Sequence, residues 1–198
     1  MKFEKKFLHV GCGPKNQKNL KGFDIDNWIE YRLDIDITHN PDILGSITDI
    51  SELESNAMDA VYSAHNIEHI FAHEVKVALK EFYRVLKEDG YLVITCPDLQ
   101  ILGENIANDK LNDPIFNSKS GPISPLDIIY GHRGYIAQGQ IYMAHKTGFT
   151  YRTLSEVIFK SGFQMVYGGR FNYDLWLIAF KKELEESDMQ YLASIHLP

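Results

Sequence analysis

Residues 7–14, FLHVGCGP, join a strand-like run to a glycine turn. A second strand-like run follows at residues 31–35, YRLDI, and places an acidic side chain, Asp34, near its end. Glycine lets the backbone turn sharply and approach a ligand where a Cβ would intrude, and a carboxylate accepts hydrogen bonds from ribose hydroxyls. Together the two runs predict a site for a nucleotide-type cofactor.

The glycine turn departs from the pattern that binds dinucleotides. Counting from Gly11, the third glycine of Gly-x-Gly-x-x-Gly is replaced by Asn16. Pro14 also removes a backbone N–H that could hold phosphate. The loop is therefore expected to lie against an adenosine-type cofactor without a phosphate. This disfavours a nicotinamide-dependent oxidoreductase, an alternative that binding of NAD would revive.

Strand-like and helical segments alternate over the first hundred residues. A helix is expected at residues 75–86, with Gly90 as its left-handed cap. Strands at residues 164–167 and 175–180 are close enough to form an antiparallel hairpin. The other expected strands are residues 7–10, 31–35, 43–47, 60–63 and 91–96. The order predicts an α/β fold with a Rossmann-like, mainly parallel sheet, a C-terminal antiparallel hairpin and an insertion after the fifth strand.

The insertion is a long connection rich in turn-forming residues. Residues 97–150 hold four of the seven prolines, among many Gly, Asn and Asp residues, so only short helices are expected there. A connection of this length in a compact domain is usually a functional lid or a binding segment. We expect residues 1–198 to form a single domain, with residues 97–150 as a substrate-side insertion or lid.

Composition restricts the classes of function. With 198 residues and 44% hydrophobic content, the chain can bury a substantial core in one domain. The net charge of -7 makes nucleic acid an unlikely partner. The two cysteines lack disulfide or metal spacing, and no apolar run has the length of a signal peptide core or a membrane span. We expect a cytoplasmic protein without membrane association, and the oligomeric state stays open.

Four segments in sequence order resemble the motifs of class I S-adenosylmethionine-dependent methyltransferases. They are residues 8–14, LHVGCGP; 33–36, LDID; 58–69, MDAVYSAHNIEH; and 81–94, EFYRVLKEDGYLVI. The chain is similar to a little-described, type 11-like branch of that family, and the resemblance extends along residues 7–97. It implies that the protein binds S-adenosylmethionine and transfers its methyl group to an acceptor.

The resemblance also implies which residues hold the cofactor. Asp34 would bind the ribose hydroxyls, and Asp36 is its rival because neighbouring acids on a strand alternate between its faces. Ser46 stands where the family has an acid for adenine, and Asp49 is a candidate substitute. The expected cofactor-binding residues are Gly11, Cys12, Gly13, Asp34, Ile35, Ser46, Ile47, Ser63, Ala64 and His65.

Histidines are the candidate catalytic residues, since a protonated acceptor requires a general base. They are His65, His69, His132 and His145. Residues 130–150 are rich in histidine, aromatic and basic side chains and are expected to cover a small-molecule or saccharide acceptor. The alternative is a non-catalytic cofactor-binding relative that acts as a partner or regulatory protein. The segment between Gly13 and Trp28 keeps that alternative open, because it is too short and polar for a strong first crossover helix.

Residues 65–69, HNIEH, also match the His-x-x-Glu-His pattern of a group of zinc peptidases. That chemistry requires a continuous helix that carries both histidines. His65 directly follows an expected strand, so a helix would begin inside the motif. No metal is therefore expected from this pattern.

Overall fold

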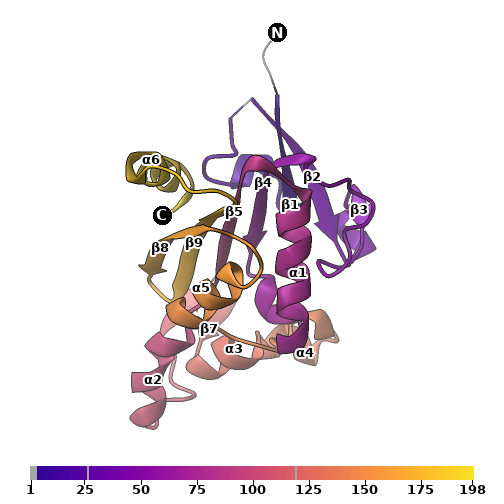
Figure 1. Ribbon diagram of the computed structural model, residues 1–198. Helices are drawn as coiled ribbons and strands as arrows, with labels where there is room; N and C mark the ends of the chain where they lie inside the picture. The colour runs from indigo at the N-terminus through magenta and orange to yellow at the C-terminus, as the bar shows by residue number, and fades with distance from the viewer. Residues whose placement is uncertain (1–3, 26, 119) are drawn as a thin grey trace.

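A seven-stranded sheet with strand order β3-β2-β1-β4-β5-β9-β8 forms the centre of the protein (Figure 1). The computed structural model describes residues 4–25, 27–118 and 120–198. The strands are β1 (Lys5–Val10), β2 (Trp28–Asp34), β3 (Ile43–Leu44), β4 (Met58–Ala64), β5 (Leu86–Pro97), β8 (Met165–Phe171) and β9 (Asp174–Phe180). The first five are parallel, and β8 and β9 form the antiparallel hairpin. The predicted Rossmann-like fold is confirmed.

Two helices cover one face of the sheet. Helix α1 (Ala72–Val85) turns Val75, Leu79 and Phe82 toward the sheet, because apolar residues three and four positions apart share one side of a helix. Each of the three is at most 3% exposed. Helix α5 (Tyr151–Phe159) packs into the same core (Figure 1). The helix predicted at residues 75–86 is therefore present as α1, which begins three residues earlier and ends one residue earlier.

The end of α1 differs from the prediction. Leu86 pairs with Met58 and begins β5, and regular pairing resumes at Tyr91. Residues 87–90 therefore form a bulge in the strand. Gly90 lies in this bulge, so its predicted role as a left-handed helix cap is wrong. The local pattern could not reveal the error, because the partner strand comes from another part of the sequence.

The end of the chain forms a helix against the opposite face. Helix α6 (Glu186–His196) buries Met189 and Ala193, and Leu197 follows them into the same apolar cluster. Phe23, from the connection between β1 and β2, belongs to this cluster too. Both faces of the sheet are thus covered, as a mainly parallel sheet requires. In the described part of the chain, no helix is long and apolar enough to cross a membrane.

The connection from β1 to β2 is short. In its described residues it holds a single-turn helix, η1 (Gln17–Asn19), and no α-helix. Asn16 caps η1 by accepting a hydrogen bond from Lys18 N at 3.1 Å. The expected absence of a strong first crossover helix is borne out over these residues, and Asn16 serves the turn as a cap.

The segment from residue 97 to residue 150 forms its own layer at the edge where the parallel strands end (Figure 1). Its elements are α2 (Leu99–Ala107), β6 (Phe116–Ser118), β7 (Gly121–Ile123), α3 (Pro125–Tyr130), α4 (Arg133–Ala137) and the single turn η4 (Ile141–Met143). Leu102, Ile123 and Ile128 give this layer a small core. The predicted short helices are present.

Candidate cofactor and acceptor site

The two glycines of the turn after β1 have different surroundings. Gly11 and Gly13 both have positive φ, +60° and +52°, which glycine adopts without strain. A Cβ on Gly11 would lie 1.8 Å from Asn66 Nδ2, whereas a Cβ on Gly13 would meet no described atom within 4 Å. Gly11 is therefore required for packing against Asn66, and Gly13 borders open space that a ligand could fill.

Asp34 is the acid that faces this turn. Its Oδ2 accepts a hydrogen bond from Gly13 N at 2.7 Å, and its Oδ1 accepts one from Asp36 N at 2.9 Å. The rival Asp36 is partly exposed and caps the single turn η2 (Ile37–His39), where it accepts hydrogen bonds from Thr38. Of the two acids, only Asp34 contacts the glycine turn.

Two further side chains contact Asp34 or the glycine turn. Cys12 is buried with its Sγ 3.8 Å from Asp34 Oδ2, and burial raises the pKa of its thiol to about 11. A protonated, buried thiol is a packing group rather than a nucleophile. Arg32 donates hydrogen bonds to the carbonyl oxygens of Gly13 at 2.7 Å and Asn40 at 2.9 Å. The sequence analysis missed Arg32, although its spacing of two from Asp34 on a strand predicts the same face.

The segment after β3 supplies the residues expected near adenine. Ser46 Oγ lies 2.8 Å from Thr48 Oγ1 and caps its own turn. Ile47 is 6% exposed and belongs to the main core, so only its backbone is available to a ligand. Ile35, at the end of β2, is half exposed. These residues lie on the loops that follow the first parallel strands.

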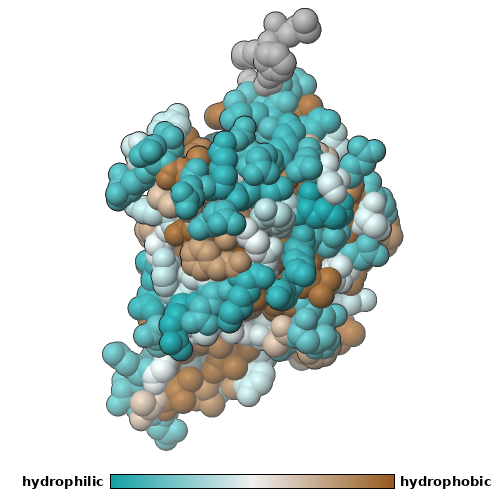
Figure 2. All heavy atoms as spheres, in the orientation of Figure 1, coloured by the Kyte–Doolittle hydropathy of each residue, from teal (hydrophilic) through white to brown (hydrophobic). Residues whose placement is uncertain are grey.

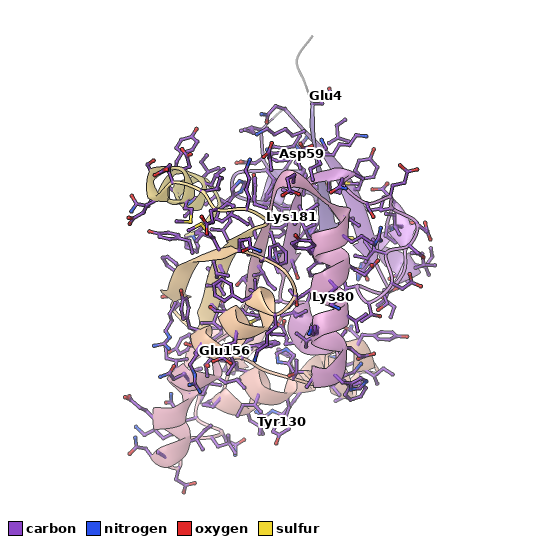
Figure 3. The ribbon with its side chains drawn as sticks, in the orientation of Figure 1. Glu4, Asp59, Lys80, Tyr130, Glu156 and Lys181 are labelled. Atoms are coloured by element: carbon purple, nitrogen blue, oxygen red, sulfur yellow. The ribbon has the colours of Figure 1, made fainter. Side chains whose placement is uncertain are left out.

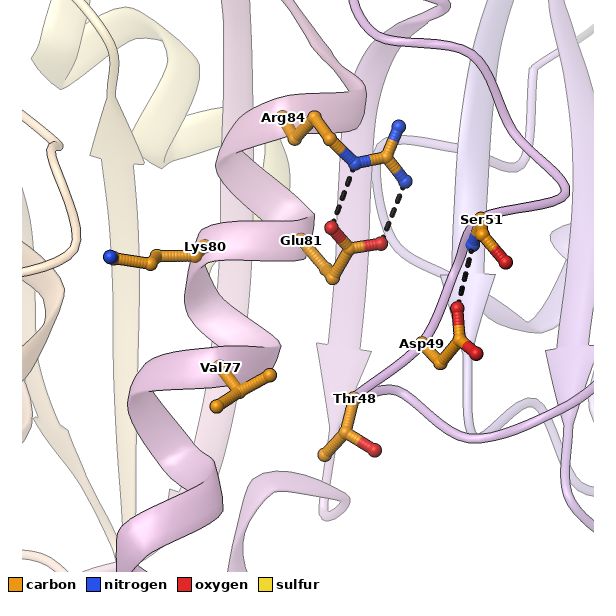
Figure 4. A pocket seen from close by; sticks show the side chains of 7 residues that line it. All are labelled: Thr48, Asp49, Ser51, Val77, Lys80, Glu81 and Arg84. Carbon is orange, nitrogen blue, oxygen red and sulfur yellow. Dashed lines mark hydrogen bonds and ion pairs between the residues drawn. The ribbon is translucent and has the colours of Figure 1, made fainter.

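Asp49, the candidate substitute for the family's acid, opens onto a different surface. Its carboxylate accepts a hydrogen bond from Ser51 N at 3.1 Å and lines a pocket of about 490 Å³ beside α1 (Figure 4). In the same pocket, Arg84 pairs with Glu81 at 2.7 Å and also donates to Ile50 O. These contacts hold α1 against the loop after β3, so they stabilise the fold.

The carboxyl end of β4 carries Ser63, Ala64 and His65. Ser63 is fully buried, and its Oγ has no hydrogen-bond partner in the described part of the chain. His65 has a φ of +50°, a backbone conformation that residues other than glycine rarely adopt. Its N–H donates to Thr95 O at 2.9 Å, which holds the turn against β5. Unusual backbone of this kind is concentrated at functional sites.

The ring of His65 lies between two carboxylates. Its Nδ1 is 3.4 Å from Glu68 Oε1, and its Nε2 is 3.5 Å from Asp174 Oδ2 at the start of β9. Desolvation acts against the charged ring, but Asp174 and Glu68 outweigh it and hold the pKa of His65 well above its usual value. The two carboxylates therefore favour the charged form of His65, and 47% of its side chain is exposed.

Three residues from distant parts of the sequence meet beside His65. Possible ligand atoms of Glu68, His69 and His145 lie within 4.8 Å of one another. Glu68 and His69 belong to the turn after β4, and His145 comes from the 97–150 segment. Lys146 N and Thr147 N donate to Glu68 O at 2.8 and 3.2 Å, which fastens this segment to the sheet. The histidines that the sequence placed on separate segments thus share one cluster.

His132 has a different environment. It is the N-cap of α4, where its Nδ1 accepts a hydrogen bond from Tyr135 N at 3.3 Å. Its ring also packs on the Tyr135 ring at a centroid distance of 4.5 Å. Among the four candidate histidines, the structure therefore brings together His65, His69 and His145 and gives His132 a capping contact. Sequence reasoning missed Asp174, since no local pattern connects the start of β9 with β4.

Comparison with known proteins agrees with this arrangement. The model of a methyltransferase domain family matches residues 8–94. No curated protein matches the chain. Three solved structures, each 16% identical to the chain, share its fold.

The three structures come from different organisms. A Pyrococcus horikoshii protein has a TM-score of 0.60, covering 92% of this chain and 84% of its own. A protein from Listeria monocytogenes, described as S-adenosylmethionine-dependent methyltransferase, has a TM-score of 0.59 with 92% and 93% coverage. A protein from Archaeoglobus fulgidus, described as a SAM-dependent methyltransferase, has a TM-score of 0.57 and covers 90% of this chain and 86% of its own. Residues 8–94, which carry the four motifs in order, therefore form a methyltransferase domain, and the chain has the fold of S-adenosylmethionine-dependent methyltransferases.

Proposed function

We propose that the protein methylates a small-molecule or saccharide acceptor at the carboxyl ends of β1, β2 and β4. The observation that carries this proposal is the buried Asp34 carboxylate bonded to Gly13 N, beside open space. Each oxygen of Asp34 accepts one backbone N–H, Oδ2 also accepts from the Cys12 thiol, and Oδ1 keeps a further lone pair for a ribose hydroxyl. A carboxylate held in this way is positioned before the ligand arrives, which lowers the entropy lost on binding.

The remaining cofactor contacts follow the order of the strands. We assign the ribose and methionine side to the turn after β1, the adenine side to the loop after β3, and the methyl side to the end of β4. The proposed contact residues are Gly11, Cys12, Gly13, Asp34, Ile35, Ser46, Ile47, Ser63, Ala64 and His65. Open α/β sheets place their ligands at these carboxyl ends.

The histidine cluster is the proposed catalytic region. When bound, the cofactor supplies a reactive sulfonium methyl group, so the protein's task is to align the acceptor and exclude water. Burial lowers the pKa of His145, although Glu68 opposes this effect, and so favours the neutral ring, which keeps a lone pair. The charged form of His65, which its two carboxylate neighbours favour, can pair with an anionic group of the acceptor. His69 completes the cluster, and His132 orients the segment that carries His145.

We propose that residues 1–198 act as one domain in which residues 97–150 cover the acceptor. Apolar surface gathers at the lower end of the molecule over α2 and α3 (Figure 2), and Tyr130 projects from that end (Figure 3). The exposed apolar and aromatic residues of the segment are Ile106, Phe116, Tyr130, Ile141 and Tyr142. Aromatic side chains of this kind suit sugar rings and small apolar molecules.

A second candidate function is that of a cofactor-binding partner protein without catalysis. The short connection between β1 and β2 favours it, because η1 provides one turn where a full crossover helix would reinforce the cofactor site. This candidate has the same cofactor contacts and differs only in turnover.

Titration calorimetry with S-adenosylmethionine and S-adenosylhomocysteine tests the cofactor site, with NAD as a control ligand. Asp34→Asn removes the charge but keeps an acceptor for Gly13 N, and Asp36→Asn is the matched control on η2. Loss of a hydrogen bond to a charged group costs about 1.5–3 kcal/mol, so Asp34→Asn should weaken binding roughly 10- to 150-fold. Asp36→Asn should bind like the original protein. Equal affinities for the two variants would refute the Asp34 assignment.

Methyl transfer to a panel of small alcohols, amines and saccharides separates the two functions. Transfer to any member supports the enzyme. Cofactor binding at micromolar affinity with no transfer to the whole panel supports the partner protein.

A further inference from the structure

The carboxylate of Glu68 is buried, and no described residue forms a hydrogen bond with it. Glu68 is 1% exposed, and neither of its carboxylate oxygens has a hydrogen-bond partner among the residues that the structure describes. His65 Nδ1 lies at an ion-pair distance of 3.4 Å from Oε1, without the geometry of a hydrogen bond. A buried carboxylate in a folded protein is normally paired, hydrogen-bonded or bound to a metal. Both oxygens of Glu68 are thus available to a further partner.

Two neighbouring imidazoles are oriented as metal ligands are. His69 Nδ1 lies 3.2 Å from Ala144 O, and His145 Nδ1 lies 2.8 Å from Ile128 O. A carbonyl oxygen can only accept, so each Nδ1 carries a hydrogen, and in the neutral imidazole Nε2 then keeps its lone pair. Metal-binding histidines commonly donate one ring N–H to a backbone carbonyl in this way, which fixes the ring and the tautomer.

The three donors are close enough for one ion. Ligand atoms about 2.1 Å from a tetrahedral metal are separated by about 3.4 Å, and the donors of Glu68, His69 and His145 lie within 4.8 Å of one another. The Glu68 carboxylate, which has no hydrogen-bond partner among the described residues, can rotate to close this difference. Two imidazoles and one carboxylate match the ligands of Zn²⁺ and related divalent transition metals, and they leave one position open.

We propose that Glu68, His69 and His145 form a binding site for a divalent transition-metal ion, with Zn²⁺ as the best fit. The ligand set differs from the helical peptidase motif, because η3 (Ile67–His69) is a single turn and His145 enters from the 97–150 segment. The ion would join the end of β4 to that segment. None of the three proposed ligands is among the cofactor contacts proposed above, and His69 and His145 lie in the proposed catalytic region.

The test is direct metal binding by the whole chain, with the affinity tag removed and prior treatment with chelator. Titration calorimetry with Zn²⁺ should give one equivalent, and Co²⁺ should give the visible absorption of a tetrahedral site. Glu68→Gln and His145→Ala should each weaken Zn²⁺ binding by more than the roughly 10- to 100-fold that loss of an outer-shell partner costs. His73→Ala is the matched control, because His73 is exposed on the first turn of α1.

The outcomes separate the metal site from a purely structural ion pair between Glu68 and His65. One equivalent that is lost in both ligand variants and retained in His73→Ala supports the proposal. Absence of Zn²⁺ and Co²⁺ binding in the original protein overturns it, and so does unchanged binding in the two ligand variants. Circular dichroism of each variant shows whether it is folded, and Glu68→Gln, being nearly isosteric, guards against loss of the fold. Because none of these readouts uses methyl transfer, failure here leaves the cofactor proposal standing.

Discussion

The two glycines after β1 provide a paired test of the cofactor site. Gly13→Ala places a methyl group where no described atom lies within 4 Å, at a φ of +52°. The left-handed conformation costs a non-glycine residue about 1–2 kcal/mol. In a protein of this size, that loss lowers the melting temperature by about 2–8 °C. Gly13→Ala should therefore fold, with a modest loss of stability.

Gly11→Ala has the same backbone strain and an additional clash. Its new Cβ would lie 1.8 Å from Asn66 Nδ2, so the Asn66 side chain must be displaced. Overpacking of this kind costs about 1–3 kcal/mol, which brings the total to about 2–5 kcal/mol with the strain included. The double variant Gly11→Ala, Asn66→Ala should regain the part that is due to the clash.

Gly13→Ala should also weaken cofactor binding. In Gly13→Ala the methyl group enters the space assigned to the ligand, so S-adenosylhomocysteine should bind about 5- to 150-fold more weakly if overpacking again costs about 1–3 kcal/mol. Thermal unfolding gives the stability of each variant, and titration calorimetry gives its affinity. Unchanged affinity in a folded Gly13→Ala protein would refute the assignment of the open space to the cofactor. Equal stability of Gly11→Ala and Gly13→Ala would refute the packing role of Gly11.

Two further predictions concern stability. Phe82→Ala removes a fully buried ring from α1 and should cost about 3–5 kcal/mol in chemical denaturation, whereas Val77→Ala on the exposed side of the same helix should stay within about 0.5 kcal/mol. Burial lowers the pKa of His196 to about 4, and its Nε2 lies 2.7 Å from Tyr91 Oη. Between about pH 6.5 and pH 4, His196 is protonated in the unfolded chain but not in the folded protein. The free energy of unfolding should therefore fall by up to about 3 kcal/mol as the pH drops through this range. His196→Asn should flatten this part of the pH profile, and an identical slope in both proteins would contradict the prediction.

The regular elements were accessible to sequence reasoning because each is defined by its own residues. The spacing of Val75, Leu79 and Phe82 describes one face of a helix, whichever surface that face meets. The same locality explains the error at Gly90. The lysine, acids and glycine before Tyr91 are typical of a helix end, but pairing between Leu86 and Met58 begins the strand earlier.

The candidate site divides in the same way. The approach of Asp34 to the glycine turn could be anticipated because β1 and β2 are neighbouring parallel strands whose ends meet. The choice between Asp34 and Asp36 required the structure, since it depends on the cap that Asp36 provides to η2. The histidine cluster was beyond any local pattern, because His145 reaches Glu68 through the path of the whole 97–150 segment.

Sequence alone was sufficient for the sheet, the glycine turn, the presence of an acid near the end of β2 and the family resemblance. These features depend on side-chain periodicity and on short strand-to-loop connections, where neighbours in sequence are also neighbours in space. The fold of the insertion decided which histidines meet and left the Glu68 carboxylate buried among them. Contacts of that kind arise when a long loop closes onto the sheet, and the energy that selects its path comes from packing and hydrogen bonds between segments far apart in the chain.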